Sequence, residues 1–319
     1  MEDRKTLPAP VVVFAYNRKD HLEKTLTALN KNRLAEESEL FIFSDGSRTE
    51  EGRERVQAVR EYIEEFRKVS RFCKTTVFYA EKNKGLANSV ISGVTSVIDQ
   101  FGKVIVVEDD LLTSLDFLEY MNQALEYYEK NDQIWSVSGY APPLPCLEAY
   151  PEDVFVGRRM ATWGWATWKN RWETVDWDVK DYPEFIRNKK LRKEFDQAGP
   201  DMTYMLMRQM NGFQDSWAIR WTYQQFKEKM YTLYPRESRV FNLGMDGSGV
   251  HCSATDRFEV EMKEDHAPCN MAEVIENPRI GEELWELGQV PYPVRLKRKF
   301  PGVLFVILRL RGSWGRKKL

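Results

Sequence analysis

The chain has 319 residues, of which 42% are hydrophobic and 30% are charged, and its formal net charge is −2. This is the composition of a soluble globular protein, and the near-neutral balance excludes nucleic acid as an electrostatic partner. The four cysteines show no CxxC spacing, so we expect neither a zinc site nor a disulfide framework. The first residues lack the pattern of a signal peptide, and we therefore expect a reduced, cytoplasmic setting.

Short apolar runs alternate with helical patterns through the first 140 residues. The runs of strand length lie at residues 10–16, 40–43, 75–79 and 103–111, with a further one at 133–139. Apolar residues recur at helical spacing between them. This alternation predicts an α/β fold with a mostly parallel central sheet flanked by helices. No GxGxxG or GxxxxGK(S/T) motif follows any strand, which excludes two common nucleotide-binding signatures.

The fourth run ends in three adjacent carboxylates, Glu108, Asp109 and Asp110. On an extended strand, Glu108 and Asp110 would share one side. The carboxyl ends of strands in an α/β sheet are where ligands bind, and carboxylate oxygens suit Mg²⁺ or Mn²⁺. The pattern predicts a divalent-cation site able to neutralise a diphosphate. The alternative is a solvated acidic turn.

Polar residues follow the other strands as well. Arg18 follows the first run at the start of a helical pattern, where its guanidinium suits a phosphate, although a helix-entry arginine without a ligand is the alternative. Asp45 follows the second run and suits a base or ribose, but Asp45-Gly46 is also a favourable turn. The basic loop at residues 81–89, which contains Lys84, opens a helix and is another candidate phosphate contact.

The chain changes character after residue 140. A proline-rich stretch at residues 141–151 marks a boundary, and we divide the chain into residues 1–140, 141–260 and 261–319. Trp163, Trp165 and Trp168 fall within six residues. This density predicts a wall for a flat ligand, with core positions as the alternative for one or two of them.

Three features concern helix caps and a loop. Ser114 precedes an apolar periodic run and is the expected cap of that helix. Asp215 precedes another helical pattern and is either its cap or a catalytic base, and the pattern alone favours the cap. Glycines in residues 242–249 predict a loop with the freedom to order over a ligand.

Taken in order, these stretches resemble inverting glycosyltransferases of the GT-A fold. The most similar are the N-acetylglucosaminyltransferase I type and bacterial sugar transferases of the family 2-like group. The similar stretches are VVVFAYNR, FIFSDGS, KNKGLANS, VVEDDLLTSLDFLEYMNQAL, IWSVSGY, the WGW at 163–165, QDSWAIR and PRESRVFNLGMDGSGVHC. They span about residues 8–253. The resemblance implies the GT-A, or nucleotide-diphospho-sugar transferase, fold with an irregular, aromatic-rich acceptor half.

The resemblance also implies roles for the donor site. Arg18 would contact the diphosphate of a nucleotide sugar and Asp45 its base, and Lys84 lies in the loop that reaches the nucleotide. Glu108, Asp109 and Asp110 match the family's DXD-like motif. In it, Asp110 would be the direct metal ligand, and Glu108 would face the donor sugar or ribose.

On the acceptor side, Asp215 matches the family's general base, which makes it the expected catalyst rather than a cap. Residues 242–251, including His251, would close on the donor. Trp163, Trp165 and Trp217 would belong to the acceptor and donor-loop region. Gln214 and Ser216 stand where the family has a tryptophan and an acid, so the donor sugar and the acceptor stay open.

We therefore expect a hexosyl- or N-acetylhexosaminyltransferase that requires Mn²⁺ or Mg²⁺. It would move a sugar from a nucleotide-diphosphate donor, expected to be a UDP-sugar, to a hydroxyl of a glycan or lipid-linked saccharide in bacterial surface polysaccharide synthesis. One base without a second carboxylate nucleophile gives inversion. Two alternatives remain. A sugar-nucleotide nucleotidyltransferase usually has an early glycine-rich basic loop, unlike FAYNRKD, and a non-catalytic carbohydrate-binding protein would not need the acidic cluster.

Residues 293–319 carry nine basic residues and no acid. The apolar run at residues 300–308 within them is far shorter than the roughly 20 residues of a membrane-spanning helix. Basic flanks around a short apolar segment predict binding to an anionic membrane surface, with a final helix packed on the domain as the alternative. The expected location is the inner face of the cell membrane, as a peripherally bound protein.

Overall fold

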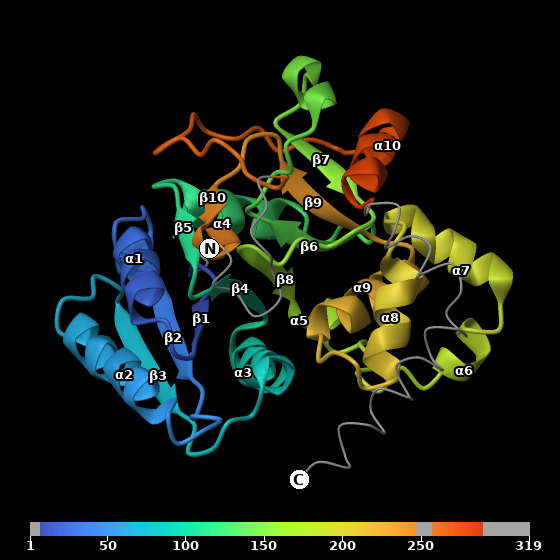
Figure 1. The fold of residues 1–319 in the computed structure, drawn as a ribbon. Helices are drawn as coiled ribbons and strands as arrows, with labels where there is room; N and C mark the ends of the chain where they lie inside the picture. The colour runs from blue at the N-terminus through green and yellow to red at the C-terminus, as the bar shows by residue number, and fades with distance from the viewer. Residues whose placement is uncertain (1–6, 247–256, 290–319) are drawn as a thin grey trace, which may run out of the picture.

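The computed structural model describes residues 7–246 and 257–289 (Figure 1). Its centre is an eight-stranded sheet in the order β3-β2-β1-β4-β8-β6-β9-β7. Within this sheet only β8 and β7 run against the other strands. The strands are β1 (Val11–Ala15), β2 (Glu39–Ser44), β3 (Lys74–Tyr79), β4 (Lys103–Glu108), β6 (Ile134–Ser138), β7 (Val154–Gly157), β8 (Trp165–Trp168) and β9 (Tyr231–Pro235).

A small second sheet pairs β5 (Leu111–Thr113) with β10 (Val240–Asn242) in antiparallel register. The helices are α1 (Lys19–Asn30), α2 (Arg53–Arg67), α3 (Leu86–Phe101), α4 (Phe117–Tyr127), α5 (Lys169–Trp172), α6 (Tyr182–Phe185), α7 (Lys189–Phe195), α8 (Met202–Met210), α9 (Trp217–Glu228) and α10 (Pro278–Leu287). In the described part of the chain no helix is long and apolar enough to cross a membrane.

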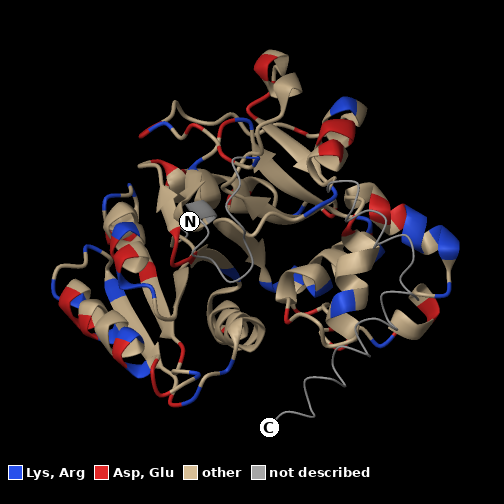
Figure 2. Cartoon of the chain, in the orientation of Figure 1, with Lys and Arg blue, Asp and Glu red and all other residues tan. Residues whose placement is uncertain are grey.

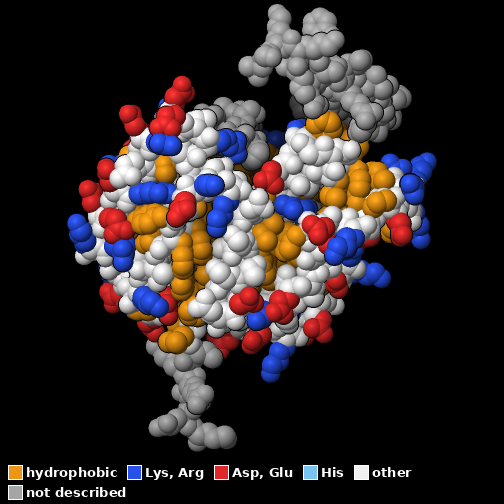
Figure 3. Space-filling view, turned by 90° about the horizontal axis from the view of Figure 1, so that it is seen from below, with side chains coloured by type: hydrophobic (Ala, Val, Ile, Leu, Met, Phe, Trp, Pro, Cys, Tyr) orange, Lys and Arg blue, Asp and Glu red, His pale blue; other side chains and the backbone are white. Residues whose placement is uncertain are grey.

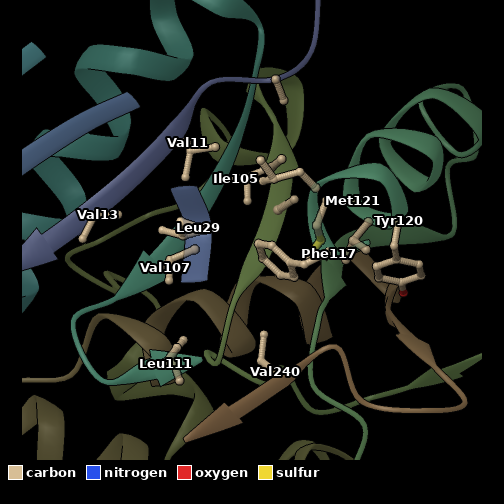
Figure 4. Close-up of a cluster of buried hydrophobic side chains, with 14 of the residues drawn as sticks. Val11, Val13, Leu29, Ile105, Val107, Leu111, Phe117, Tyr120, Met121 and Val240 are labelled. Atoms are coloured by element: carbon tan, nitrogen blue, oxygen red, sulfur yellow. The ribbon is translucent and has the colours of Figure 1, made fainter. Parts of the chain in front are cut away.

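Helices cover both faces of the sheet. One face packs against α1, α2 and α4, and the other against α3, α5 and α9. Successive residues of a strand point to opposite faces, so a strand buried on both sides must be apolar throughout. Val11 and Val13 accordingly join the first core and Val12 joins the second, and all three are fully buried. Figure 4 shows the first core, where β1 and β4 meet α1 and α4.

The outer helix faces are polar. Lysine and arginine residues alternate with acidic ones along α1 and α2 (Figure 2). Seen from below, hydrophobic side chains form separate patches among charged groups (Figure 3). Phe78, Leu86 and Phe213 are among the large hydrophobic residues that stay exposed, at 46%, 42% and 42%.

The predicted fold class is confirmed, and the expected strands lie within two residues of their predicted positions except at one place. The run at residues 103–111 is not a single strand, because β4 ends at Glu108 and the chain turns before β5. The cap prediction for Ser114 is wrong, because α4 begins at Phe117 and Asp116 occupies the N-cap position. The division of the chain at residue 140 stays a prediction. The central sheet contains strands from both sides of this position, so the sheet does not separate the two parts.

The topology places one edge of the sheet where a ligand is expected. β1 lies between β2 and β4, in parallel register with both. The chain leaves β1 through α1 toward β2 and returns from β3 through α3 to β4, on the other side of β1. The carboxyl ends of β1 and β4 therefore flank a topological switch point, the usual position of a ligand in such sheets.

Candidate active site

The acidic motif, Glu108 to Asp110, lies in a turn at the carboxyl end of β4. Val107 before it and Leu111 after it are fully buried. Asp109 and Asp110 connect these two anchored strands and are only 6% and 7% exposed. Adjacent carboxylates removed from water are costly unless a cation meets them.

Arg18 brings a cation to the motif. Its Nη2 contacts Oδ1 of Asp109 and lies 2.9 Å from Oδ2 of Asp110. These residues are far apart in sequence but meet because β1 and β4 are neighbours and both end at this edge. Burial lowers the pKa of Arg18, but the charges of Asp109 and Asp110 outweigh burial and hold it above its ordinary value.

One guanidinium does not neutralise three carboxylates. Burial, together with the charges of Asp110 and Asp109, raises the pKa of Glu108 to about 8. Burial also raises the pKa of Asp109 above its ordinary value, although Arg18 opposes this. The motif therefore carries more negative charge than the surrounding protein compensates, and protons or a further cation must balance it.

The motif fits a divalent cation. Oδ1 of Asp110 is buried without a hydrogen-bond partner, and an unpaired carboxylate oxygen is a ligand position for Mg²⁺ or Mn²⁺. Within residues 7–246 and 257–289, no three His, Cys, Asp or Glu side chains gather around one point. Mg²⁺-type ions are commonly held by one or two carboxylates together with substrate phosphates and water. Asp110 as the main protein ligand agrees with that pattern and stays a prediction.

One expectation about this region is corrected. Because β4 ends at Glu108, strand alternation does not pair Glu108 with Asp110, and Asp109 and Asp110 together face Arg18. The expected freedom of the loop at residues 242–249 stays a prediction, but Gly244 also has a steric role that the sequence did not indicate. A Cβ at Gly244 would overlap Oδ2 of Asp110, and the Leu243 amide donates to the Asp110 carbonyl at 2.8 Å.

Asp45 organises the loop that carries Lys84. Its Oδ1 accepts from the amides of Gly46 at 2.8 Å and Lys84 at 2.9 Å. Its Oδ2 accepts from the Gly85 amide and from Asn83 Nδ2, each at 3.1 Å. A carboxylate offers about four acceptor positions, so a base bound to Asp45 would have to replace one of these donors. The Lys84 side chain is exposed beside the sheet edge.

Asp215 lies between α8 and α9 and does not cap a helix. Ser216 caps α9, because its side chain accepts from the Ile219 amide. The Asp215 side chain is 57% exposed, and its Oδ1 lies 3.8 Å from Nη2 of Arg220. A Cβ at Gly85 would lie 3.3 Å from Oδ2 of Asp215. The cap interpretation is thus wrong, and an exposed carboxylate stands beside the loop that carries Lys84.

The loop around Asp215 is held in place by its neighbours. The Ser216 amide donates to Oε1 of Gln209 at 2.5 Å, and Gln214 Nε2 donates to the Met205 carbonyl at 2.9 Å. Trp217 stacks on Trp165 at 5.0 Å between ring centroids. Since β8 carries Trp165 and pairs with β4, this stack connects the start of α9 to the strand of the acidic motif.

The tryptophan-rich stretch is mainly core, which corrects the predicted ligand wall. Trp165, Trp168 and Trp217 are 0%, 2% and 3% exposed, so their faces are closed to a ligand. Trp163 alone among the four is partly exposed, and it packs edge-on against Tyr140 at 4.5 Å. Tryptophans are frequent here because the side chains of β8 point to both faces of the sheet and both faces are buried. Trp165 points toward α9 and Trp168 toward α4.

Two predicted features lie outside the described residues. These are His251, in the expected closing loop, and the basic tail at residues 293–319. The sequence interpretation missed Asn83 as a partner of Asp45 and missed the reason for Gly244. Asn83 stands between two lysines in the candidate phosphate loop, and this position could have indicated a role for it. No local sequence pattern identifies a glycine that is required by a distant carboxylate.

Comparisons with known proteins identify a family for this chain. The family model of the GNT-I family matches residues 2–212, a range that contains Arg18, Asp45, Lys84 and the acidic motif and ends before Asp215. No curated protein matches the sequence. Among solved structures, one similar chain is the mannosyltransferase PcManGT from Pyrobaculum calidifontis in complex with GDP-Man and Mn²⁺. It is 15% identical with a TM-score of 0.38, and the match covers 54% of this chain and about half, 49%, of that one.

Proposed function

This chain belongs to the GNT-I family of glycosyltransferases, and from that premise we propose that it is a metal-dependent, inverting enzyme. It moves a sugar from a nucleotide-diphosphate donor to a hydroxyl of a glycan or lipid-linked saccharide. The observation that carries the proposal is the meeting of Arg18 with the buried Asp109 and Asp110 at the switch point of the sheet.

Donor binding follows from the charges at this edge. Asp110 would hold Mn²⁺ or Mg²⁺ through its unpaired Oδ1, and such an ion stabilises negative charge that develops on the diphosphate leaving group. Arg18 presents a planar fork suited to the same diphosphate. Lys84, exposed on the loop fixed by Asp45, adds a second positive charge from the side of β2 and β3.

Asp215 is the proposed general base. An attacking hydroxyl is neutral and must lose its proton as the new bond forms. The exposed carboxylate of Asp215 takes that proton, and the fixed loop and Trp217 hold it next to Gly85 at the edge of the donor site. A single displacement with one base inverts the configuration of the transferred sugar.

The proposal names a UDP-sugar as donor and surface polysaccharide synthesis in a bacterium as the setting. The acceptor approaches Asp215 from the solvent side, where Phe213 exposes an aromatic face suited to the apolar face of a sugar ring. Trp163 is another partly exposed aromatic residue in this half of the chain.

Membrane association is a separate part of the proposal. The basic residues and the apolar run within 293–319 suit an anionic bilayer surface at the inner face of the cell membrane. Co-sedimentation with vesicles that contain phosphatidylglycerol tests this at low and high salt. The full chain should bind at low salt, and a chain that ends at Tyr292 should not. Equal behaviour of the two forms would contradict the role of the tail.

The central experiment measures release of nucleoside diphosphate from a panel of UDP- and GDP-sugars, with Mn²⁺ and with chelator. The account expects release of the diphosphate from one donor, only with the metal and faster with a saccharide acceptor. A nucleotidyltransferase would instead release or consume pyrophosphate, and a carbohydrate-binding protein would release nothing. Either of these results would contradict the proposed function.

A further inference from the structure

We infer that Arg18 and the divalent cation compete for the two carboxylates Asp109 and Asp110. The free enzyme then binds the cation weakly, and the donor diphosphate opens the site by drawing Arg18 away from the acidic motif. The inference rests on the proposed function, because it requires a metal site at Asp110 and a diphosphate donor.

The first observation is where Arg18 points. Its Nη2 lies against both carboxylates, in contact with Asp109 and 2.9 Å from Asp110. Asp109 and Asp110 are more than nine-tenths buried, whereas the Arg18 side chain is 24% exposed. The guanidinium thus stands between two buried acids and the solvent side of the switch point, where a phosphate group would arrive.

The second observation is how the two oxygens of Asp110 differ. Oδ2 faces Arg18 and is packed against Gly244, while Oδ1 is buried and unpaired. A cation bound at Oδ1 would share this carboxylate with the guanidinium. Two positive charges a few ångströms apart repel strongly in a site of low polarity. The two cations therefore compete through charge even without sharing an oxygen atom.

A diphosphate changes this balance. It offers Arg18 bidentate oxygen partners and leaves the two carboxylates to the metal. Cation and nucleotide then strengthen each other's binding, and this coupling is reciprocal by thermodynamic necessity. Arg18 acts as a place-holder that partly compensates the buried acids until the donor arrives.

The test is a titration of the protein with Mn²⁺ alone, followed through the electron paramagnetic resonance signal of free Mn²⁺. Arg18→Gln should bind Mn²⁺ at least about tenfold more tightly than the wild type, which corresponds to about 1.4 kcal/mol. Arg33→Gln is the matched control, because Arg33 also joins two carboxylates, Glu119 and Asp265, but on the surface away from the motif. It should leave the affinity unchanged. Equal or weaker Mn²⁺ binding by Arg18→Gln overturns the inference.

A second titration, with uridine diphosphate present, separates this inference from the proposed function. In the wild type the nucleotide should strengthen Mn²⁺ binding, and in Arg18→Gln the same nucleotide should strengthen it by a factor about tenfold smaller. If the nucleotide strengthens Mn²⁺ binding equally in both proteins, Arg18 does not compete with the metal, but the proposed metal site is still supported. If neither protein binds Mn²⁺ even with the nucleotide, the proposed metal site fails as well.

Arg18→Lys is a second variant that keeps the inference testable if Arg18→Gln does not fold. Lysine keeps the charge but loses the fork, so its Mn²⁺ affinity should lie between those of the wild type and Arg18→Gln. Thermal melting gives an independent measure. Mn²⁺ should raise the melting temperature of Arg18→Gln more than that of the wild type or Arg33→Gln. An equal rise in all three proteins contradicts the inference.

Discussion

Two buried clusters, the acidic motif with Arg18 and the group of Asp116, Arg239 and His266, differ in how completely their charges are matched. In the cluster formed by Asp116, Arg239 and His266, each carboxylate oxygen has a partner. Arg239 Nε lies 3.3 Å from Oδ2, and His266 Nδ1 lies 2.9 Å from Oδ1. All three side chains are at most 7% exposed. Although burial opposes it, the hydrogen bond from His266 and the charge of Arg239 lower the pKa of Asp116 to about 2.

The acidic motif is the opposite case. One arginine faces three acids, Oδ1 of Asp110 is unpaired, and the pKa of Glu108 rises to about 8. Both clusters are buried, so burial alone does not distinguish them. The balance of charge does. Both carboxylate oxygens of Asp116 are paired within the protein, so its cluster is structural, whereas Oδ1 of Asp110 is left for a ligand.

The largest expected effect is loss of activity in Asp110→Asn. The amide keeps the shape of the side chain but removes its negative charge, so turnover with Mn²⁺ should fall to the level of the wild type in chelator. The melting temperature without metal should not fall, because one uncompensated buried charge is gone. Nucleoside diphosphate release and thermal melting measure the two quantities. Mn²⁺-stimulated turnover in this variant would contradict the assignment of Asp110.

Asp215→Asn should reduce turnover by roughly 10²–10⁴, the range ascribed to general-base catalysis, with unchanged donor binding. Asp178→Asn is the matched control, since Asp178 also acts on Arg220 through its charge and is exposed. It should retain activity. If donor affinity falls as much as turnover in Asp215→Asn, the residue has a structural role and another group is the base.

Gly244→Ala should have a smaller effect, a loss of roughly tenfold in Mn²⁺ affinity, by moving Oδ2 of Asp110. Gly281→Ala provides the control, because Gly281 lies inside α10 with open space at its Cβ position. Alanine there should leave Mn²⁺ binding unchanged and stabilise the helix by up to about 1 kcal/mol. Wild-type Mn²⁺ affinity in Gly244→Ala would show that Asp110 tolerates displacement.

The smallest effect on turnover is expected for Asp116→Asn, which should instead reduce the free energy of unfolding. A folded pKa of about 2 against an ordinary 3.8 corresponds to about 2 kcal/mol. Because the folded pKa is the lower one, this stabilisation is complete above about pH 4 and is lost as the pH falls toward 2. Urea unfolding at pH 7 and pH 3 should show a smaller difference between wild type and variant at pH 3. A large loss of turnover in the folded variant would show that the Asp116 cluster is not purely structural.

The sheet and the acidic motif could be predicted because their signals are local. A strand buried on both faces must be continuously apolar, and three acids at its end conflict with burial unless they serve a ligand. The meeting of Arg18 with Asp109 was not predictable from spacing, since it depends on β1 and β4 becoming neighbours. The resemblance to glycosyltransferases supplied the role of Arg18, but not its contact with the acids.

The errors also have physical reasons. Tryptophan density does not reveal which way a side chain points, and Trp165 and Trp217 fill the space between the sheet and α9. Asp215 was predicted as either a cap or a base, but Ser216, the next residue, takes the cap position of α9, which leaves Asp215 exposed. The steric role of Gly244 was not predictable, because its reason lies in a carboxylate that is distant in sequence.

A crystal structure of the protein with Mn²⁺ and uridine diphosphate, with the metal located by its anomalous scattering, tests the central claim most directly. One strong peak is expected next to Oδ1 of Asp110, with Arg18 turned from the acidic motif toward the diphosphate. No peak should lie at Asp116. A metal bound elsewhere, or an Arg18 that still joins Asp109 and Asp110 beside a bound metal, would contradict the account.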